Sequence, residues 1–203
     1  MARKFKFYSA DHLVKDYPDA QYYVIYGERS NGKTYDSLSR GLKNYAKNGD
    51  QFAYLRRWGE DIRSKNLNNL FSGHIENGYL SSLFGPDGWN QIYYRSGRFY
   101  LERREEDGTI TRDETPCGFA FDLNGMEHYK STSFPRVTTI IFDEFLSRNG
   151  YLPNEFVLFQ NSLSTIIRHR DNVRIFMLGN TVNQSCPYFN EMGLTHIKQQ
   201  KQG

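Results

Sequence analysis

The sequence predicts an α/β fold, with a mostly parallel central sheet, helices on both faces and a β-hairpin insertion. Three observations support this fold class. Short apolar runs typical of strands alternate with segments typical of helices along the 203 residues. The first apolar run, 21–26, leads directly into a glycine-rich turn and a helix. The clearest apolar run, 137–142, ends on two adjacent acids, Asp143 and Glu144.

Each expected element rests on apolar periodicity and on the glycine, proline and asparagine residues that break it. A helix should follow the glycine-rich turn and end near the Asn48-Gly49 pair. The charged stretch 103–113 should extend a hairpin and turn at Asp107-Gly108. In chain order we expect a strand at 21–26, a helix at 33–47, a strand at 51–56, helical or looped segments at 60–90, a hairpin at 91–102, a short strand at 117–121, a strand at 137–142, a helix at 154–168 and a strand at 173–178.

Composition limits the classes of protein that remain. With 38% apolar and 24% charged residues, the chain suits one globular domain over 1–197, followed by a polar tail at 198–203. No apolar run approaches the ~18 residues of a membrane-crossing helix, so we expect no membrane partner and a cytoplasmic location. The net charge of +3 neither requires nor excludes nucleic acid. The two cysteines, Cys117 and Cys186, match no metal-ligand spacing and are expected to be thiols.

The glycine-rich turn matches the complete GxxxxGKT pattern between a strand and a helix, the context that makes this pattern a phosphate site. Backbone N–H groups of the loop and of the helix N-terminus can surround a triphosphate. Lys33 would contact the β- and γ-phosphates, and the Thr34 hydroxyl would hold Mg²⁺. The alternative is a turn that only joins strand to helix. The expected binding residues are Gly27, Glu28, Arg29, Ser30, Asn31, Gly32, Lys33, Thr34 and Tyr35.

Asp143 and Glu144 follow the 137–142 strand at its C-terminal end, where open α/β sheets bind ligands. Asp143 is placed to organise Mg²⁺ beside Thr34, and Glu144 to activate the water that attacks the γ-phosphate. A glutamate at this position favours hydrolysis over phosphoryl transfer to a small molecule. The alternative is a pair of solvated loop acids.

Two further groups of polar residues are candidates for catalysis. Asn180, after the last strand, would sense the γ-phosphate, or else simply leave the strand in a turn. Arg168 and Arg170 close the helix before that strand and could reach a neighbouring subunit's γ-phosphate. Cations also interact favourably with a helix C-terminus, so both explanations stay open.

With these motifs in place, the chain resembles the phi29-like phage DNA-packaging ATPases, the terminase-type packaging motors. The most specific stretch is Phe134 to Phe145, preceded by Tyr129-Lys130-Ser131. The aromatic strand that ends in Arg56 and Arg57 also matches. Further matches lie at 97–100, 151–155 and 187–189, so that the resemblance covers about residues 20 to 190.

The resemblance implies a RecA-like P-loop NTPase of the ASCE class that hydrolyses ATP with Mg²⁺. It also implies a homomeric ring, a pentamer when assembled, that drives double-stranded DNA into a procapsid in the host cytoplasm, with the phage portal and prohead RNA as partners. By position, Arg168 is the trans-acting arginine finger, with Arg170 as the fallback. Lys130 falls on a lysine that acts between subunits or near DNA, or is a solvated loop residue. Arg56 and Arg57 lie near the nucleotide, a subunit boundary or DNA, or are solvated.

The chain departs from the family pattern in two places. Gly59 replaces a basic residue that follows the paired arginines, and the 103–113 stretch lengthens the hairpin. Full-length relatives carry a C-terminal nuclease-like domain, so the tail at 198–203 is expected to begin a linker to it. Three rival functions remain: another ring-type DNA translocase or helicase, a nucleotide-binding scaffold without turnover, and a metabolic kinase, which the Asp-Glu pair disfavours.

Overall fold

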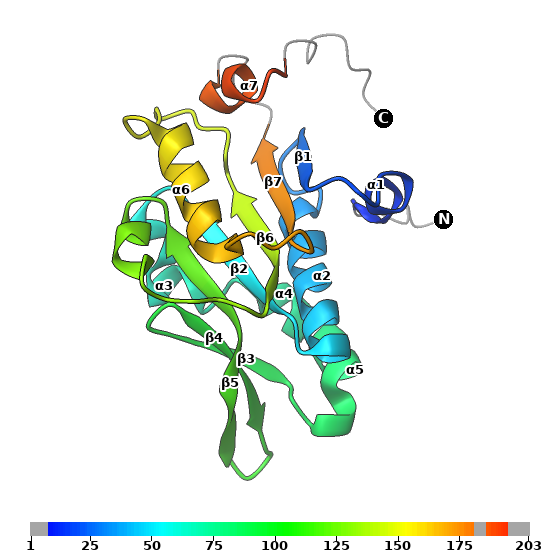
Figure 1. The fold of residues 1–203 in the computed structure, drawn as a ribbon. Coiled ribbons are helices and arrows are strands. Elements are labelled where there is room, and N and C mark those ends of the chain that lie inside the picture. The colour runs from blue at the N-terminus through cyan, green and yellow to red at the C-terminus, as the bar shows by residue number, and fades with distance from the viewer. Residues whose placement is uncertain (1–7, 181–185, 195–203) are drawn as a thin grey trace.

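The computed structural model describes residues 8–180 and 186–194, which form one seven-stranded sheet with helices on both faces (Figure 1). The strand order is β1-β7-β6-β2-β5-β4-β3. Strands β1, β7, β6, β2 and β5 pair in parallel, whereas β4 and β3 are antiparallel additions at one edge. The strands are β1 (Tyr22–Gly27), β2 (Gln51–Arg56), β3 (Gln91–Arg95), β4 (Arg98–Arg104), β5 (Ile110–Asp122), β6 (Val137–Asp143) and β7 (Arg174–Asn180).

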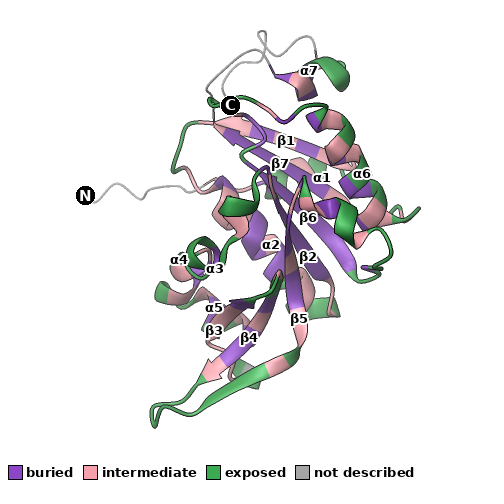
Figure 2. Ribbon diagram, turned by 90° about the vertical axis from the view of Figure 1, so that its left-hand side faces the viewer, coloured by how far each residue is buried: buried purple, intermediate pink, exposed green. Residues whose placement is uncertain are grey.

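Helices cover the two faces of the sheet unequally, as Figure 2 shows. Four helices, α2 (Lys33–Asn48), α3 (Ser64–Leu67), α4 (Ser72–Glu76) and α5 (Tyr79–Phe84), cover one face and share a core with it. The opposite face packs against α6 (Glu155–Ile167) and the short α7 (Pro187–Glu191). Helix α1 (Asp11–Asp16) lies near the N-terminus, and 3₁₀ turns occupy Gly59–Ile62, Gly85–Asp87 and Gly125–Tyr129.

The central strands are apolar because both of their faces are covered. All seven residues of β6 are buried, and β2 is buried except for its last residue, Arg56. Continuous apolar runs of this kind are typical of parallel strands between two helical layers. Because β1, β7 and β6 pair in parallel, their carboxyl ends meet at one edge of the sheet, and the polar residues at these ends lie together.

Glycine sets both ends of α2. Gly32 precedes the helix at φ 95°, and Gly49 follows it at φ 71°, with its N–H donating to the Tyr45 carbonyl at 2.8 Å. Both residues adopt left-handed backbone conformations that cost glycine little, so the helix begins at the phosphate-loop lysine and ends where the sequence predicted.

Strand β5 differs from its prediction, because it spans Ile110–Asp122 rather than a short run at 117–121. Its first part pairs only with β4 in an exposed hairpin arm, and its second part enters the sheet beside β2. The arm projects from the body and turns at Gly108, φ 87° (Figure 2). The predicted charged extension of the hairpin at 103–113, with its turn at Asp107-Gly108, is therefore confirmed, but the sequence did not predict that its second strand continues through 114–116 into the 117–121 run.

The other expected strands and helices are confirmed to within one or two residues at most ends. Segment 60–90 consists of short helices and turns, as expected, whereas α1 and α7 were not predicted. The predicted polar tail at 198–203 lies outside the described residues. Among residues 8–180 and 186–194, no helix has the length and apolar character needed to cross a membrane.

Candidate functional site

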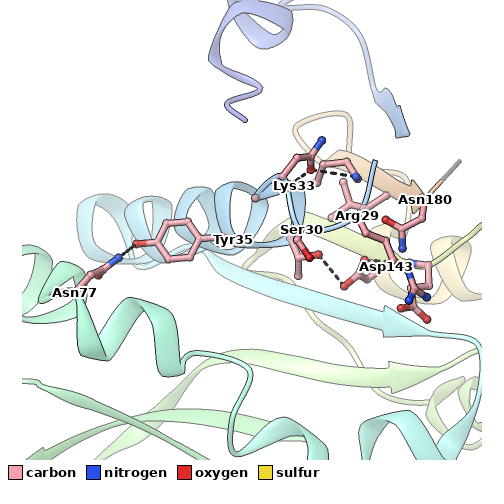
Figure 3. Close-up of a pocket in the computed structure, with 13 residues that line it drawn as sticks. Arg29, Ser30, Lys33, Tyr35, Asn77, Asp143 and Asn180 are labelled. Atoms are coloured by element: carbon pink, nitrogen blue, oxygen red, sulfur yellow. Dashed lines mark hydrogen bonds between the residues drawn. The ribbon is translucent and has the colours of Figure 1, made fainter. Parts of the chain in front are cut away.

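The two sequence motifs meet at the carboxyl edge of the sheet. The Thr34 hydroxyl donates to Asp143 Oδ2 at 3.1 Å across 109 positions of sequence. They border a pocket of about 620 Å³ (Figure 3), lined by Arg29, Ser30, Asn31, Gly32, Lys33, Thr34, Tyr35, Asn77, Asp143, Glu144, Leu178, Gly179 and Asn180. The predicted sensor residue Asn180 lies beside the loop because β7 pairs with β1, so that it sits opposite Gly27.

The glycine-rich loop is held by its own side chains. Lys33 Nζ donates to the Glu28 carbonyl at 2.6 Å and to Asn31 Oδ1 at 3.1 Å, and only 6% of Lys33 is exposed. Burial lowers the Lys33 pKa, an effect opposed by the negative charge of Asp143. A phosphate group in the pocket could replace these loop oxygens as the partner of the lysine. The loop also holds Ser30 at φ 59°, an uncommon conformation for a residue other than glycine.

Asp143 is the buried acid of the site, with an exposed fraction of 8%. Its Oδ2 accepts hydrogen bonds from Thr34 and from the Tyr54 hydroxyl at 3.0 Å. Burial raises the pKa of Asp143, although the charge of Arg56 and the two hydroxyl hydrogen bonds oppose the shift. Nothing in the pattern of strand β2 had singled out Tyr54, because a buried tyrosine there is also typical of a core residue.

The donor set at Asp143 fits Mg²⁺, which prefers hard oxygen ligands and keeps several waters. Thr34 and Asp143 offer a hydroxyl and a carboxylate oxygen on the same side of the pocket. In the described part of the chain, no cluster of three or more His, Cys, Asp or Glu side chains could hold a metal alone. Phosphate oxygens and water would therefore have to complete the coordination of the cation.

Glu144 directly follows β6 and has a left-handed backbone, with φ 60°. Its side chain is 48% exposed, and its Oε2 accepts a 2.7 Å hydrogen bond from Arg56 Nη2. Arg56 also pairs with Asp61 at 3.2 Å and lies 3.9 Å from Asp143. Arg56 therefore lies beside two residues that line the pocket, Asp143 and Glu144, which fits the expected location near the nucleotide.

Arg57, the next residue, points away from the solvent. It is 4% exposed and forms a bidentate ion pair with the buried Glu155 through contacts of 2.7 and 2.8 Å. The predicted contact of Arg57 with DNA or a neighbouring subunit finds no support in this geometry, because the guanidinium is engaged by Glu155 and by two backbone carbonyls of its own chain. No periodicity distinguishes two adjacent arginines at a strand end, so the sequence could not separate their roles.

Tyr35 and Asn77 close the end of the pocket farthest from Asp143, as Figure 3 shows. Asn77 Nδ2 donates to the Tyr35 hydroxyl at 2.7 Å, and the Tyr35 ring stacks on His74 with centroids 3.9 Å apart. Asn77 was not predicted, since it follows the short α4 far from either motif.

Arg168 lies at the opposite edge of the sheet from Asp143. It follows the last residue of α6, a helix that starts on the pocket side and spans about 20 Å at 1.5 Å per residue (Figure 1). The exposed Arg168 donates to the carbonyls of Lys130 and Thr132 at 2.8 and 2.9 Å. Lys130 is itself exposed and pairs with Glu127. Arg168 and Lys130 therefore share one surface, and neither lies beside the pocket of its own chain.

Arg170 is partly exposed, but its guanidinium is fully engaged by its own chain. Its guanidinium nitrogens donate at 2.6–3.1 Å to the carbonyls of Phe134, Pro135, Val137, Ile166 and Ile167. An arginine has five N–H groups, so all of its donors have partners. This arrangement ties the end of α6 to the start of β6 and leaves Arg168 as the better candidate for an intermolecular role.

Comparison with known proteins shows to which family the chain belongs. Residues 97–199 match the family described as podovirus DNA encapsidation protein (Gp16). The chain belongs to this family. The resemblance to phi29-like packaging ATPases predicted from the sequence is confirmed.

The relatives are phage DNA packaging proteins. That of Bacillus phage B103 is 33% identical over 173 residues, which cover 84% of this chain and 47% of the relative. That of Bacillus phage phi29 is 30% identical over 168 residues, with coverages of 81% and 44%. The chain thus spans about half the length of the packaging proteins that it matches.

Solved structures agree with this assignment. The N-terminal domain of the DNA packaging ATPase from bacteriophage phi29 matches with a TM-score of 0.74 and 28% identity, covering 96% of this chain and 89% of that one. A chain of the phi29 genome packaging motor assembly gives a TM-score of 0.68, also at 28% identity, with coverages of 92% and 51%. The large terminase ATPase domain of Thermus phage P74-26, at 13% identity and a TM-score of 0.52, shares the fold, with coverages of 85% and 63%.

Proposed function

We propose that this chain hydrolyses ATP with Mg²⁺ and that the hydrolysis drives phage DNA packaging. The observation that carries the proposal is the Thr34–Asp143 hydrogen bond, because it joins the two halves of a phosphate and magnesium site. A RecA-like ATPase of the ASCE class is further supported by β7, which lies between the loop strand β1 and the acid strand β6. Adenine as the base is proposed from the ATPases among the structural relatives.

Lys33 and the loop N–H groups bind the triphosphate, and Thr34 and Asp143 hold the cation. Bound Mg²⁺ neutralises phosphate charge as it develops. Lys33 exchanges the Glu28 carbonyl and Asn31 for phosphate oxygens when the nucleotide enters. A bound cation would stabilise the ionised form of Asp143, because burial has removed part of the hydration of its negative charge.

Glu144 orients and deprotonates the attacking water, and Asn180 contacts the γ-phosphate from β7. Both side chains line the pocket. The side chain of Glu144 is 48% exposed at the pocket, but its carboxylate pairs with Arg56. For catalysis the carboxylate has to exchange this arginine for the attacking water.

A neighbouring copy completes the site by inserting Arg168. This part of the proposal rests on the separation of Arg168 from its own pocket by the length of α6. Arg168 stabilises charge on the transferred phosphoryl group, as arginine fingers do in related reactions. Lys130, on the same exposed surface, contributes to the contact between copies or to DNA binding.

Double-stranded DNA is the proposed cargo, held through its phosphates and therefore in a salt-dependent manner. A homomeric ring, a pentamer when assembled, moves the DNA into a procapsid through the portal and in contact with prohead RNA, in the host cytoplasm. The support is the similarity to a chain of the phi29 packaging motor assembly. These partners belong to the whole packaging protein, of which this chain corresponds to about half.

Nucleotide binding tests the phosphate site directly. A fluorescent ATP analogue, with and without Mg²⁺, should bind the wild-type chain, and Lys33→Ala should weaken its affinity about 10- to 100-fold because a buried charge-assisted contact is lost. Lys65→Ala removes an exposed lysine of α3 and should change nothing. Equal affinities of Lys33→Ala and wild type would contradict the assigned phosphate site.

A further inference from the structure

Arg57, Glu155 and Tyr188 form a buried network beside the pocket, with exposed fractions of 4%, 2% and 0%. Arg57 Nε and Nη2 donate to the two carboxylate oxygens of Glu155 at 2.7 and 2.8 Å. The Tyr188 hydroxyl donates to Glu155 Oε1 at 2.7 Å, and the Leu152 N–H to Oε2 at 2.8 Å. The network joins the end of β2, the start of α6 and helix α7.

The remaining contacts of Arg57 go to the backbone next to the proposed catalytic residue. Its Nη1 donates to the Glu144 carbonyl at 3.0 Å and its Nη2 to the Phe145 carbonyl at 2.8 Å. One guanidinium thus binds two successive carbonyls of the turn after β6 while its other side binds Glu155. Only a planar fork of donors can make these four contacts at once.

The turn that Arg57 holds is strained. Glu144 has φ 60°, a conformation that costs a residue with a Cβ and persists only where the surroundings enforce it. Two further hydrogen bonds fix the same turn: the Glu144 N–H donates to Asp143 Oδ1 at 3.0 Å, and the Phe145 N–H to the Leu178 carbonyl at 3.1 Å. Arg57 supplies the contacts on the carbonyl side.

We propose that Arg57, locked by Glu155 and Tyr188, is a positioning residue for the water-activating Glu144. It holds the backbone of Glu144 in the left-handed conformation that directs the carboxylate toward the pocket. The inference rests on the proposed function, because it assigns a task to a residue only if Glu144 is catalytic. Arg57 is not among the residues that line the pocket, and we assign it no direct part in the chemical step.

A second buried acid in the same chain offers a matched control. Glu102 is also fully buried and pairs with Arg104 and Arg112 at 2.6 and 2.7 Å, but it lies in the β4–β5 arm and does not line the pocket. Glu102→Gln therefore removes a buried charge that pairs with two exposed arginines, without touching the turn after β6.

The test compares ATP turnover by Arg57→Lys, Glu102→Gln and wild type at a temperature at which thermal melting shows all three to be folded. Lysine keeps the positive charge beside Glu155 but cannot bridge the carboxylate and both carbonyls. We expect kcat of Arg57→Lys to fall about 10- to 100-fold, with KM for ATP within about twofold, since misplacement of a reacting group affects the chemical step. Glu102→Gln should keep the wild-type kcat.

A wild-type kcat in Arg57→Lys, or an equal loss in Glu102→Gln, overturns the inference. If Arg57→Lys does not fold, Glu155→Gln replaces it, because this change removes the charge that holds one side of the Arg57 guanidinium. A lower kcat in Glu155→Gln would then support the inference, and a wild-type kcat would overturn it. Hydrogen exchange of residues 144–149 should be faster in either variant than in Glu102→Gln, and unchanged exchange also contradicts the inference.

Glu144→Gln, measured in the same assay, separates the proposed catalytic role of Glu144 from the proposed positioning role of Arg57. If it is inactive while Arg57→Lys is normal, only the positioning role fails. If Glu144→Gln turns over ATP like wild type, the proposed function fails, and the exchange measurement still shows whether Arg57 holds the turn.

Discussion

Asp143 links the chemistry of the site to the stability of the fold at the scale of one residue. Burial raises its pKa above the ordinary carboxyl value of 3.8, so the folded protein holds the proton more tightly than the unfolded chain does. Ionised Asp143 therefore lowers stability when no cation is bound. Such a cost is tolerated at functional sites, where binding of the partner relieves it.

Asp143→Asn is expected to raise the melting temperature of the nucleotide-free protein at pH 7 while abolishing Mg²⁺-dependent ATP turnover. In the wild type, stability contributed by this residue should fall as pH rises through the interval between 3.8 and its raised pKa. The amide variant should lack that dependence. Thermal unfolding from pH 4 to 7 measures both, with the exposed Asp16→Asn as control. A variant less stable than wild type at pH 7 would contradict the assignment.

His74 gives the opposite dependence on pH. Burial lowers its pKa from 6.5 to about 4, and its Nε2 lies 3.0 Å from Ser39 Oγ and 3.2 Å from the Tyr35 carbonyl. The folded state therefore disfavours protonation, and stability is complete above pH 6.5 and is lost as pH falls toward 4.

The free energy of unfolding should fall by up to about 1.4 kcal/mol per pH unit between pH 6.5 and 4 on account of His74. His74→Phe keeps a ring against Tyr35 but binds no proton, so it should flatten this part of the profile. Urea unfolding at several pH values measures the effect, and the exposed His128→Gln serves as control. The same slope in His74→Phe as in wild type would show that other groups cause it.

At the scale of elements, the two arginines at the end of α6 have different tasks. Arg170 binds five carbonyls of the α6 end and the segment before β6, whereas the exposed Arg168 binds two carbonyls of the 130–132 loop. This difference supports a structural role for Arg170 and the proposed intermolecular role for Arg168.

Arg170→Ala should therefore lower the free energy of unfolding by about 1–3 kcal/mol, because five carbonyls, most of them in partly buried hydrogen bonds, lose a charged donor. Arg168→Ala should cost less than about 1 kcal/mol, as is usual for exposed positions. Chemical denaturation of the two variants measures both values. A larger loss in Arg168→Ala would reverse the assignment.

The sequence predicted the elements whose signals are local. The glycine-rich loop, the apolar strand β6 and helix α6 can each be recognised from a short stretch of consecutive residues. Parallel pairing of the strands then brings Thr34 close to Asp143. Contacts made across the chain left no such signal. Arg57 and Glu155 are 98 residues apart, and neither residue type reveals that the pair is buried. The charged extension of the hairpin was predicted from its turn at Asp107-Gly108, but its continuity with the 117–121 run was not, because residues 114–116 carry no apolar alternation.

At the scale of the whole molecule, the pocket and Arg168 lie at opposite edges of the sheet. An arrangement in which one copy's Arg168 reaches the next copy's pocket is head-to-tail, and a head-to-tail contact closes into a ring when its rotation permits. The polarity of α6 therefore supports the proposal that neighbouring copies share the site.

Mixtures of Glu144→Gln and Arg168→Ala chains test this sharing. Each variant alone should be inactive when assembled, but a mixed assembly contains interfaces with an intact Glu144 on one side and an intact Arg168 on the other. We expect ATP turnover to recover in mixtures, and absence of recovery from assembled mixtures would contradict an arginine supplied in trans.

The most direct test of the central claim is the fate of ATP bound to Glu144→Gln in the presence of Mg²⁺. The account predicts that this variant binds ATP with an affinity close to that of wild type and retains it unhydrolysed, whereas wild type releases phosphate. Phosphate release at the wild-type rate by Glu144→Gln, or a loss of ATP binding in a folded variant, would contradict the claim that Glu144 performs hydrolysis at this site.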